Sequence, residues 1–256
     1  MGNFFEKNTN KTKLCHNKSH CSKNNYYNDK NVKVTKIDPV KIVYFNNKVH
    51  KINKEGEIIF KNSFNDIIDD NYICVLKQFN KIIFGFSFNQ EVKNKFTSNV
   101  TYIQFGHNFN KSVNFMIIDG EENNIQELIL GEKFNFPVDN LPPRLKKISF
   151  GYEFNFPVDN LPNCIEYIKF GNDFDQNIDY LPCSLIHIIL GDNFNHNIDN
   201  IPSSVKFIEI GKNFNKSINN IPIGLEKIKF EKNYYENNKE YLDKILLSNE
   251  FVKISF

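Results

Sequence analysis

GYEFNFPVDNLPNCIEYIKF, from Gly151 to Phe170, is one of five 20-residue copies of a single pattern that run without insertion from residue 131 to residue 230. Each copy opens on a glycine: Gly131, Gly151, Gly171, Gly191 and Gly211. A fixed period of this length is the signature of a solenoid, in which each coil packs only against its neighbours. The pattern therefore predicts a stack of coils.

The apolar positions of one copy predict how a single coil folds. Leu145, Ile148 and Phe150 follow the spacing L-x-x-I-x-F, which puts them on the inner face of a short strand because alternate strand residues share a face. Gly151 then predicts a turn whose backbone conformation a Cβ would penalise, and Phe154 points back inward. Twenty residues are too few for a strand, two turns and a helix, so the return side is predicted to be irregular.

Looser copies extend the pattern on both sides, over residues 61–130 and 231–256. The predicted fold class is a β-rich repeat solenoid, a leucine-rich-repeat-like stack of about nine coils of 20–26 residues, with one parallel β-sheet face and little helix. Residues at helical spacing between about 236 and 247 predict a C-terminal capping helix.

The segments before residue 61 differ in composition from the repeats. Residues 39–60 alternate short β-like runs with turn residues and predict a β-meander that caps the N-terminal end of the solenoid. Residues 1–38 are rich in Lys and Asn and predict a disordered tail. The solenoid itself is assigned to residues 61–256, with its regular core at 131–230.

Three columns recur when the copies are aligned. A predicted aromatic spine comprises Phe64, Phe88, Phe109, Phe134, Phe154, Phe174, Phe194, Phe214 and Tyr234. Amide side chains that could bond to one another or to turn backbone form the column Asn65, Asn89, Asn110, Asn135, Asn155, Asp175, Asn195 and Asn215. A carboxylate column, ending on an amide, comprises Asp139, Asp159, Asp179, Asp199 and Asn219. For this last column the sequence favours Asx-turns over a Ca²⁺ site, since Asn219 would remove charge from a cation site.

Composition argues against several classes of partner. The net charge is +2, and Arg144 is the only arginine, which disfavours nucleic-acid binding. No apolar run is long enough to span a membrane. The odd number of cysteines, five, and the lack of a leader predict a reducing, intracellular and cytoplasmic location, that of the host if the protein is viral.

The tail carries two weak motifs. Met1-Gly2 would suit N-myristoylation, but Glu6 stands where Ser or Thr is expected. Four metal-capable residues crowd into seven positions, and their spacing differs from that of structural zinc sites; they are Cys15, His16, His20 and Cys21. We predict no metal or cofactor.

The unit F-N-x-x-[IV]-[DN]-x-[LI]-P, followed by L-x-x-[IL]-x-[FIL]-G, resembles the FNIP repeat, a leucine-rich-repeat-like family of social amoebae and of giant viruses that infect amoebae. The resemblance covers about residues 61–256 and is strongest over 131–230. The motif proline is kept in the copies at 134–137 and 154–157, whereas later copies read FDQN, FNHN and FNKS. Many family members carry an N-terminal F-box and resemble ubiquitin-ligase adaptors, but residues 1–60 show no such segment.

No motif of a nucleophile, phosphate loop or catalytic metal occurs, so the sequence predicts a protein that is not an enzyme. Outward-facing residues on three consecutive predicted strands of the predicted concave face form the candidate site for a protein partner: Tyr167, Lys169, His187, Ile189, Phe207 and Glu209. The predicted function is a protein-interaction scaffold. A substrate-recognition subunit of a ubiquitin ligase, and a structural protein that self-associates through its C-terminal strand edge, remain as alternatives.

Overall fold

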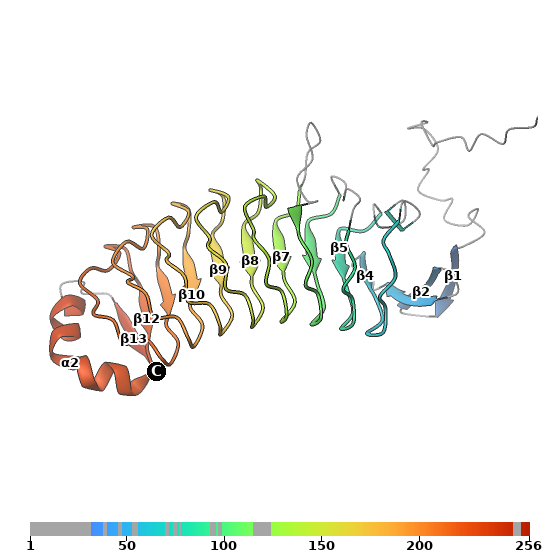
Figure 1. Ribbon diagram of the computed structural model, residues 1–256. Coiled ribbons are helices and arrows are strands. Elements are labelled where there is room, and N and C mark those ends of the chain that lie inside the picture. The colour runs from blue at the N-terminus through green and yellow to red at the C-terminus, as the bar shows by residue number, and fades with distance from the viewer. Residues whose placement is uncertain are drawn as a thin grey trace, which may run out of the picture.

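A single sheet runs the length of the molecule (Figure 1). The computed structural model describes residues 32–37, 40–45, 48–52, 56–69, 72–73, 76, 78–92, 96, 99–114, 124–247 and 252–256. In these residues thirteen strands are hydrogen-bonded in chain order from β1 to β13. The first four pair antiparallel: β1 (Val32–Ile37), β2 (Val40–Phe45), β3 (Lys48–Ile52) and β4 (Glu57–Ile59).

From β4 onward every pairing is parallel and in register, one strand per coil. These three-residue strands are β5 (Lys81–Ile83), β6 (Tyr102–Gln104), β7 (Glu127–Ile129), β8 (Lys147–Ser149), β9 (Tyr167–Lys169), β10 (His187–Ile189), β11 (Phe207–Glu209), β12 (Lys227–Lys229) and β13 (Lys253–Ser255). The predicted β-solenoid with one parallel sheet face is confirmed, and each strand falls where the L-x-x-I-x-F spacing puts it.

The N-terminal elements begin earlier than the sequence predicts. Strands β2 to β4 lie within the segment assigned to the cap, but β1 begins at Val32, inside the segment assigned to the tail. The predicted boundary at residue 38 therefore lies too far along the chain, because Val32-Lys-Val34 already alternates like a strand. The predictions for Gly2 and for Cys15 to Cys21 lie outside the described residues.

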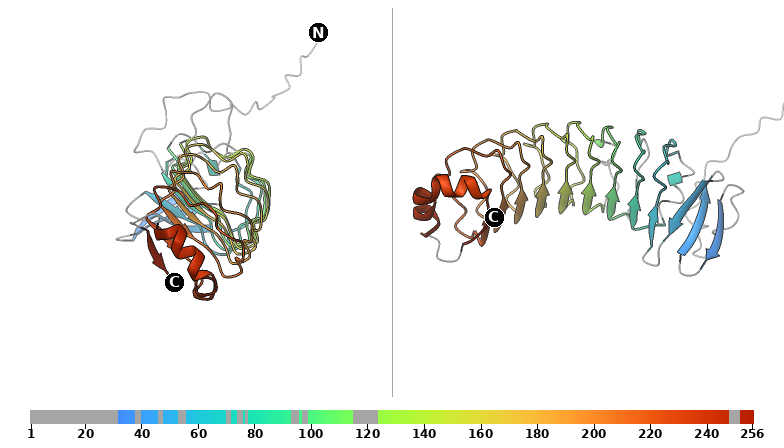
Figure 2. Two further views of the ribbon diagram at one scale, coloured as in Figure 1. Left: turned by 90° about the vertical axis from the view of Figure 1, so that its left-hand side faces the viewer. Right: turned by 90° about the horizontal axis from the view of Figure 1, so that it is seen from below.

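The aromatic spine is present and shows how the stack bends. Ring centroids in successive coils from Phe64 to Phe214 are 5.8–6.3 Å apart. One residue beyond the strands, pairs such as Phe150 and Phe170 are 5.1–5.3 Å apart, and parallel strands themselves are about 4.8 Å apart. Because the spacing grows away from the sheet, the stack curves with the sheet on its concave side (Figure 2).

The glycines that open the copies lie at the corner where each coil turns after its strand, and we call them the corner glycines. Their role differs from the one predicted. Among the described glycines, only Gly56 has a positive φ, of 77°. At Gly151 an added Cβ would lie 1.9 Å from the carbonyl oxygen of Gly131. Glycine recurs because the backbones of neighbouring coils touch at this corner, and the expectation of a special turn conformation is wrong.

The asparagine column links each coil to the next through backbone hydrogen bonds. The Asn155 N–H donates to Asn135 Oδ1 at 3.0 Å, Asp175 N–H to Asn155 Oδ1 at 3.0 Å, and Asn195 N–H to Asp175 Oδ1 at 2.9 Å. In each case one side-chain oxygen accepts a hydrogen bond from the backbone N–H of the next coil. A carboxylate supplies the same acceptor, which explains why Asp175 fits in a column of amides.

The carboxylate column also acts between coils, so the prediction that each Asp forms its own turn is wrong. Asp199 accepts the Asn219 N–H at 2.7 Å and the Asn219 side-chain amide at 2.8 Å. The Asx-turn is made two residues earlier, where Asn197 Oδ1 accepts the Asp199 N–H at 2.6 Å. In the described part of the chain no three His, Cys, Asp or Glu side chains are placed to hold a metal ion.

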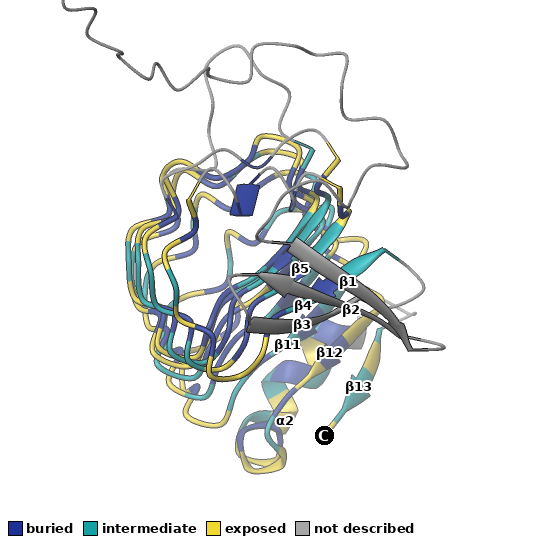
Figure 3. Ribbon diagram, turned by 90° about the vertical axis from the view of Figure 1, so that its right-hand side faces the viewer, coloured by how far each residue is buried: buried dark blue, intermediate teal, exposed yellow. Residues whose placement is uncertain are grey.

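Helix α2 (Lys232–Leu247) lies at the C-terminal end of the stack, beside β12 and β13 (Figures 1 and 3). It begins four residues before the predicted capping helix. Tyr234 continues the aromatic spine, with its ring 5.2 Å from that of Phe214, and its hydroxyl donates to the Lys216 carbonyl at 2.7 Å. The Tyr241 hydroxyl accepts the Ile218 N–H at 3.2 Å. The helix therefore satisfies backbone groups that a further coil would otherwise bind.

None of the helices in the described residues is long and apolar enough to cross a membrane.

Candidate functional site

The six predicted binding residues lie in two rows across three neighbouring strands. The parallel register pairs Tyr167 with His187 and His187 with Phe207. In the second row it pairs Lys169 with Ile189 and Ile189 with Glu209. In each strand the middle residue is buried and these flanking residues are not, so both rows face outward. The structure brings all six together on the concave side of the sheet.

The first row forms a continuous aromatic strip. The centroids of Tyr167 and His187 are 5.1 Å apart with ring planes at 82°, and those of His187 and Phe207 are 5.6 Å apart at 52°. All three side chains are half-buried by one another and by the neighbouring strands. The strip is an exposed apolar surface whose rings already hold one another in place, which lowers the entropic cost of binding.

Ile186 adds to this strip and was missed by the sequence prediction. It is 37% exposed and directly precedes His187. The spacing L-x-x-I leaves two consecutive positions outside the core, and only the second of them was counted as part of the strand surface. The burial pattern of the spacing itself was the signal that could have found Ile186.

The strip shifts the ionisation of its members. Burial raises the pKa of Tyr167, and the nearby Glu209 and Glu127 raise it further. Burial lowers the pKa of His187; Glu209 opposes this effect and Lys227 adds to it. His187 is therefore neutral at pH 7 and presents an uncharged ring between two aromatic neighbours.

We expect NMR titration of the His187 ring to give a pKa below the ordinary value of 6.5. Because the folded chain disfavours the protonated ring, His187 should lower the free energy of unfolding as pH falls below 6.5. The double variant Tyr167→Ala/Phe207→Ala uncovers the ring and should move the pKa back toward 6.5. An equal pKa in the two proteins would contradict the assignment of burial as the cause.

Ion pairs border the strip on the concave face. Lys146 Nζ lies 3.2 Å from Glu166 Oε1, and Lys206 Nζ lies 2.8 Å from Glu226 Oε1. Exposed pairs of this kind contribute little to stability. The residue just before each strand is Lys146, Glu166, Ile186, Lys206 and Glu226 in successive coils. Ile186 is therefore an apolar residue between two ion pairs.

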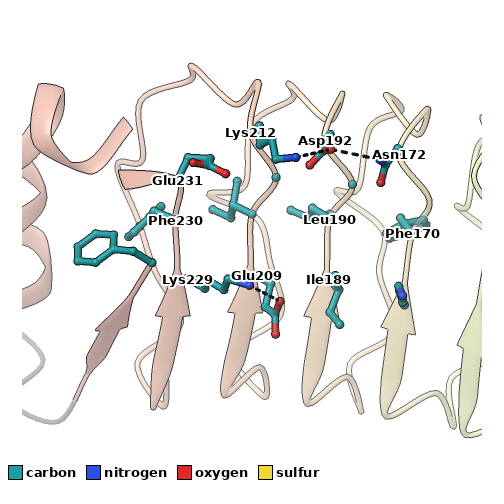
Figure 4. Close-up of a pocket in the computed structure, with 15 residues that line it drawn as sticks. Phe170, Asn172, Ile189, Leu190, Asp192, Glu209, Lys212, Lys229, Phe230 and Glu231 are labelled. Atoms are coloured by element: carbon teal, nitrogen blue, oxygen red, sulfur yellow. Dashed lines mark hydrogen bonds and ion pairs between the residues drawn. The ribbon is translucent and has the colours of Figure 1, made fainter. Parts of the chain in front are cut away.

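A shallow groove of about 240 Å³ adjoins the second row, at the carboxyl ends of β9 to β12 (Figure 4). Lys169, Ile189 and Glu209 line it, and Lys229 Nζ lies 3.4 Å from Glu209 Oε2. Tyr167, His187 and Phe207 are not part of its lining.

Corner residues of three coils complete the groove and were not predicted. Asp192 Oδ2 accepts a hydrogen bond from the Asn172 amide at 3.1 Å and lies 3.4 Å from Lys212 Nζ. Each of these residues follows a corner glycine, at a position where the copies differ from one another. That variation was a signal, but the prediction considered only strand residues.

The arrangement offers contact surface rather than reactive groups. In the described part of the chain the imidazole ring of His187 makes no hydrogen bond, although its backbone N–H donates to the Glu166 carbonyl at 3.0 Å, so nothing there orients the ring as a base toward a nucleophile. The groove is open and its charges are largely paired. What the face presents is an aromatic strip, charged borders and a groove along one side.

These features define the class of the protein as a leucine-rich-repeat-like β-solenoid. The family model "FNIP Repeat" matches residues 134–173, 154–193, 174–213 and 194–233, so residues 134–233 of this chain are FNIP repeats. The predicted resemblance is thereby confirmed for the regular coils.

No curated protein matches the sequence. Among solved structures, the crystal structure of CroV588, described as a novel circular LRR protein structure, is similar to this chain at 26% identity with a TM-score of 0.45. The match covers 72% of this chain and 38% of that one, so this chain spans well under half of that structure.

Proposed function

We propose that this protein is a non-enzymatic scaffold that binds a protein partner on the concave face of its sheet, through the strip Tyr167, Ile186, His187 and Phe207. The observation that carries the proposal is the grouping of these half-exposed apolar side chains on three adjacent strands, bordered by ion pairs. Apolar side chains inside a polar rim are how binding hot spots in protein interfaces are built. Solenoids commonly use their concave surfaces in this way.

A reducing compartment suits the cysteines of the regular coils. Cys164 and Cys183 are exposed and are not joined to any other cysteine in the described residues. Exposed free thiols persist in reducing, intracellular surroundings. We therefore place the proposed interaction inside the cell.

The test is affinity capture from cell lysate with the wild-type chain and the variant Tyr167→Ala/Phe207→Ala. We expect the variant to lose the specific partner. The matched control is Tyr152→Ala/Tyr180→Ala, which removes two aromatic side chains that are 49% and 71% exposed outside the strands, and it should retain the partner. Retention by both variants would refute the proposal. Capture of cullin-pathway proteins would identify a ubiquitin-ligase subunit, and capture of only further copies of this chain would identify self-association.

A further inference from the structure

The concave face of β8 to β12 carries an excess of positive charge around the aromatic strip. The outward positions are the residue before each strand and the first and third residues of the strand. In β8 to β12 they hold six lysines and three glutamates: Lys146, Lys147, Lys169, Lys206, Lys227, Lys229, Glu166, Glu209 and Glu226. The three glutamates are each paired with a lysine. Lys147, Lys169 and Lys227 are exposed and make no ion pair in the described residues. Net positive charge is therefore available to a ligand on this face.

Two of the unpaired lysines stand at the ends of the aromatic strip. The register runs Lys147, Tyr167, His187, Phe207, Lys227 across β8 to β12. Four strand-to-strand steps put the backbones of Lys147 and Lys227 about 19 Å apart. The face thus presents an apolar centre with a cation at each end.

The charged residues beyond these two lysines limit how far an acidic ligand can extend in one direction along the face. Glu127 on β7 is the register partner of Lys147, and it would repel a carboxylate placed further toward the N-terminal coils. At the other end Lys253 on β13 follows Lys227, so positive charge continues there. A ligand of complementary charge therefore begins at Lys147 and extends toward β12 and β13.

The sheet also restricts the backbone conformation of the ligand. The strands beneath the strip are hydrogen-bonded to neighbours on both sides, so a segment lying across them cannot pair with them through its backbone. An extended segment would leave its own N–H and C=O groups against apolar side chains, which is costly. A helix satisfies these groups internally. Because a helix rises 1.5 Å per residue and has 3.6 residues per turn, side chains about 14 residues apart share one face and are roughly 21 Å apart, close to the distance between these lysines.

We propose, resting on the proposed function above, that the partner docks through an acidic amphipathic helix, with apolar residues against Tyr167, His187 and Phe207 and carboxylates about 14 residues apart on the same face that meet Lys147 and Lys227. Complementary charges at the two ends set the register of such a helix, while the apolar centre supplies affinity.

Single-stranded nucleic acid is the other polyanion that aromatic rings and lysines can bind, and the geometry disfavours it. Tyr167, His187 and Phe207 are inclined to one another by 82° and 52°, so they offer no series of parallel faces on which successive bases could stack. Glu166, Glu209 and Glu226 lie among the lysines and would repel a continuous phosphate chain. The only arginine, Arg144, donates to Asn124 Oδ1 at 2.6 Å.

The test is selection from a displayed library of 16-residue amphipathic helices whose terminal positions are randomised. On the wild-type chain we expect enrichment of Asp and Glu at both ends, about 14 residues apart on the same face of the helix. The variant Lys147→Glu/Lys227→Glu leaves the aromatic strip intact and should instead enrich Lys and Arg at those positions. The enriched peptides should lose at least tenfold in affinity when 0.5 M salt is added, since exposed charges are screened.

The outcomes separate this proposal from the broader one. Enriched helices with uncharged ends that fail to bind Tyr167→Ala/Phe207→Ala would overturn the acidic helix and leave the concave interface standing. Enriched helices that bind this variant as well as they bind the wild type would overturn both. Failure to enrich any helix, or displacement of the enriched peptides by a 12-nucleotide oligothymidine at 0.15 M salt, would overturn the acidic helix, and the latter would identify nucleic acid as the ligand.

Discussion

Replacing Gly191 with alanine is expected to lower the free energy of unfolding by more than about 3 kcal/mol, at the upper end of what single substitutions do. The added Cβ would lie 1.9 Å from the Gly171 carbonyl oxygen, 2.5 Å from the carbonyl carbon of the same residue and 2.8 Å from Asn172 Cα. All three are backbone atoms, so no side chain can rotate away to make room. The coils must separate instead, which disturbs the hydrogen bond of 2.9 Å between the Asn193 N–H and the Asn172 carbonyl.

The control for this variant is Gly224→Ala. There the nearest atom to an added Cβ is the Ser203 carbonyl oxygen, 3.7 Å away, and the backbone φ is not positive. We expect this change to be neutral or to stabilise by up to about 1 kcal/mol, because alanine has fewer unfolded conformations. Urea denaturation followed by circular dichroism measures both variants. Similar losses in the two would show that contact between corner backbones is not the reason for the glycine column.

The sequence predicts the regular architecture well because the repeat supplies many aligned examples of one coil. The bounds of β5 to β12 follow from a single spacing, in which Ile148 and Phe150 point inward and Lys147 and Ser149 outward. The same alignment places Tyr167, His187 and Phe207 side by side. Successive side chains of a strand point to opposite faces of the sheet, so the sequence of a single chain is enough to predict which residues share a face.

What the sequence does not predict is whether a recurring residue serves its own coil or the next. Asp199 recurs at a turn and was assigned to that turn, but its carboxylate binds Asn219 and Asn220 of the following coil. Gly151 was likewise explained within its own turn, although its role is to let another backbone approach. A repeat alignment shows only that a position is restricted, and both explanations produce the same column.

The candidate site likewise contains residues that the sequence predicts and residues that it does not. The strand rows were predicted from register, whereas the groove formed with Asn172, Asp192 and Lys212 was not. Its existence depends on the shape of the corner, which is set by the contact between glycine backbones of neighbouring coils. That contact is a property of the stack and not of any single copy.

Replacing Phe174 with alanine is expected to cost about 3–5 kcal/mol, the range for a fully buried phenylalanine. Its ring is completely buried and lies 6.0 Å from that of Phe154, 6.2 Å from that of Phe194 and 3.8 Å from that of Phe170. The change therefore removes contacts from two coil-to-coil interfaces at once. In a solenoid, stability is close to a sum of coil and interface contributions, so a central coil loses more than a terminal one.

This prediction can be separated from a general sensitivity to the loss of aromatic residues. Tyr180→Ala lies in the same coil and removes a side chain that is 71% exposed, and we expect it to change the free energy of unfolding by less than about 0.5 kcal/mol. Phe207→Ala removes a side chain that is only half-buried, so it should cost clearly less stability than Phe174→Ala, although it is expected to weaken partner binding. If Phe174→Ala were as mild as these two variants in urea denaturation, the aromatic spine would not be what holds the coils together. The buried rings of the spine would then contribute no more to the stability of the fold than the half-exposed rings of the strip, which are free to bind a partner.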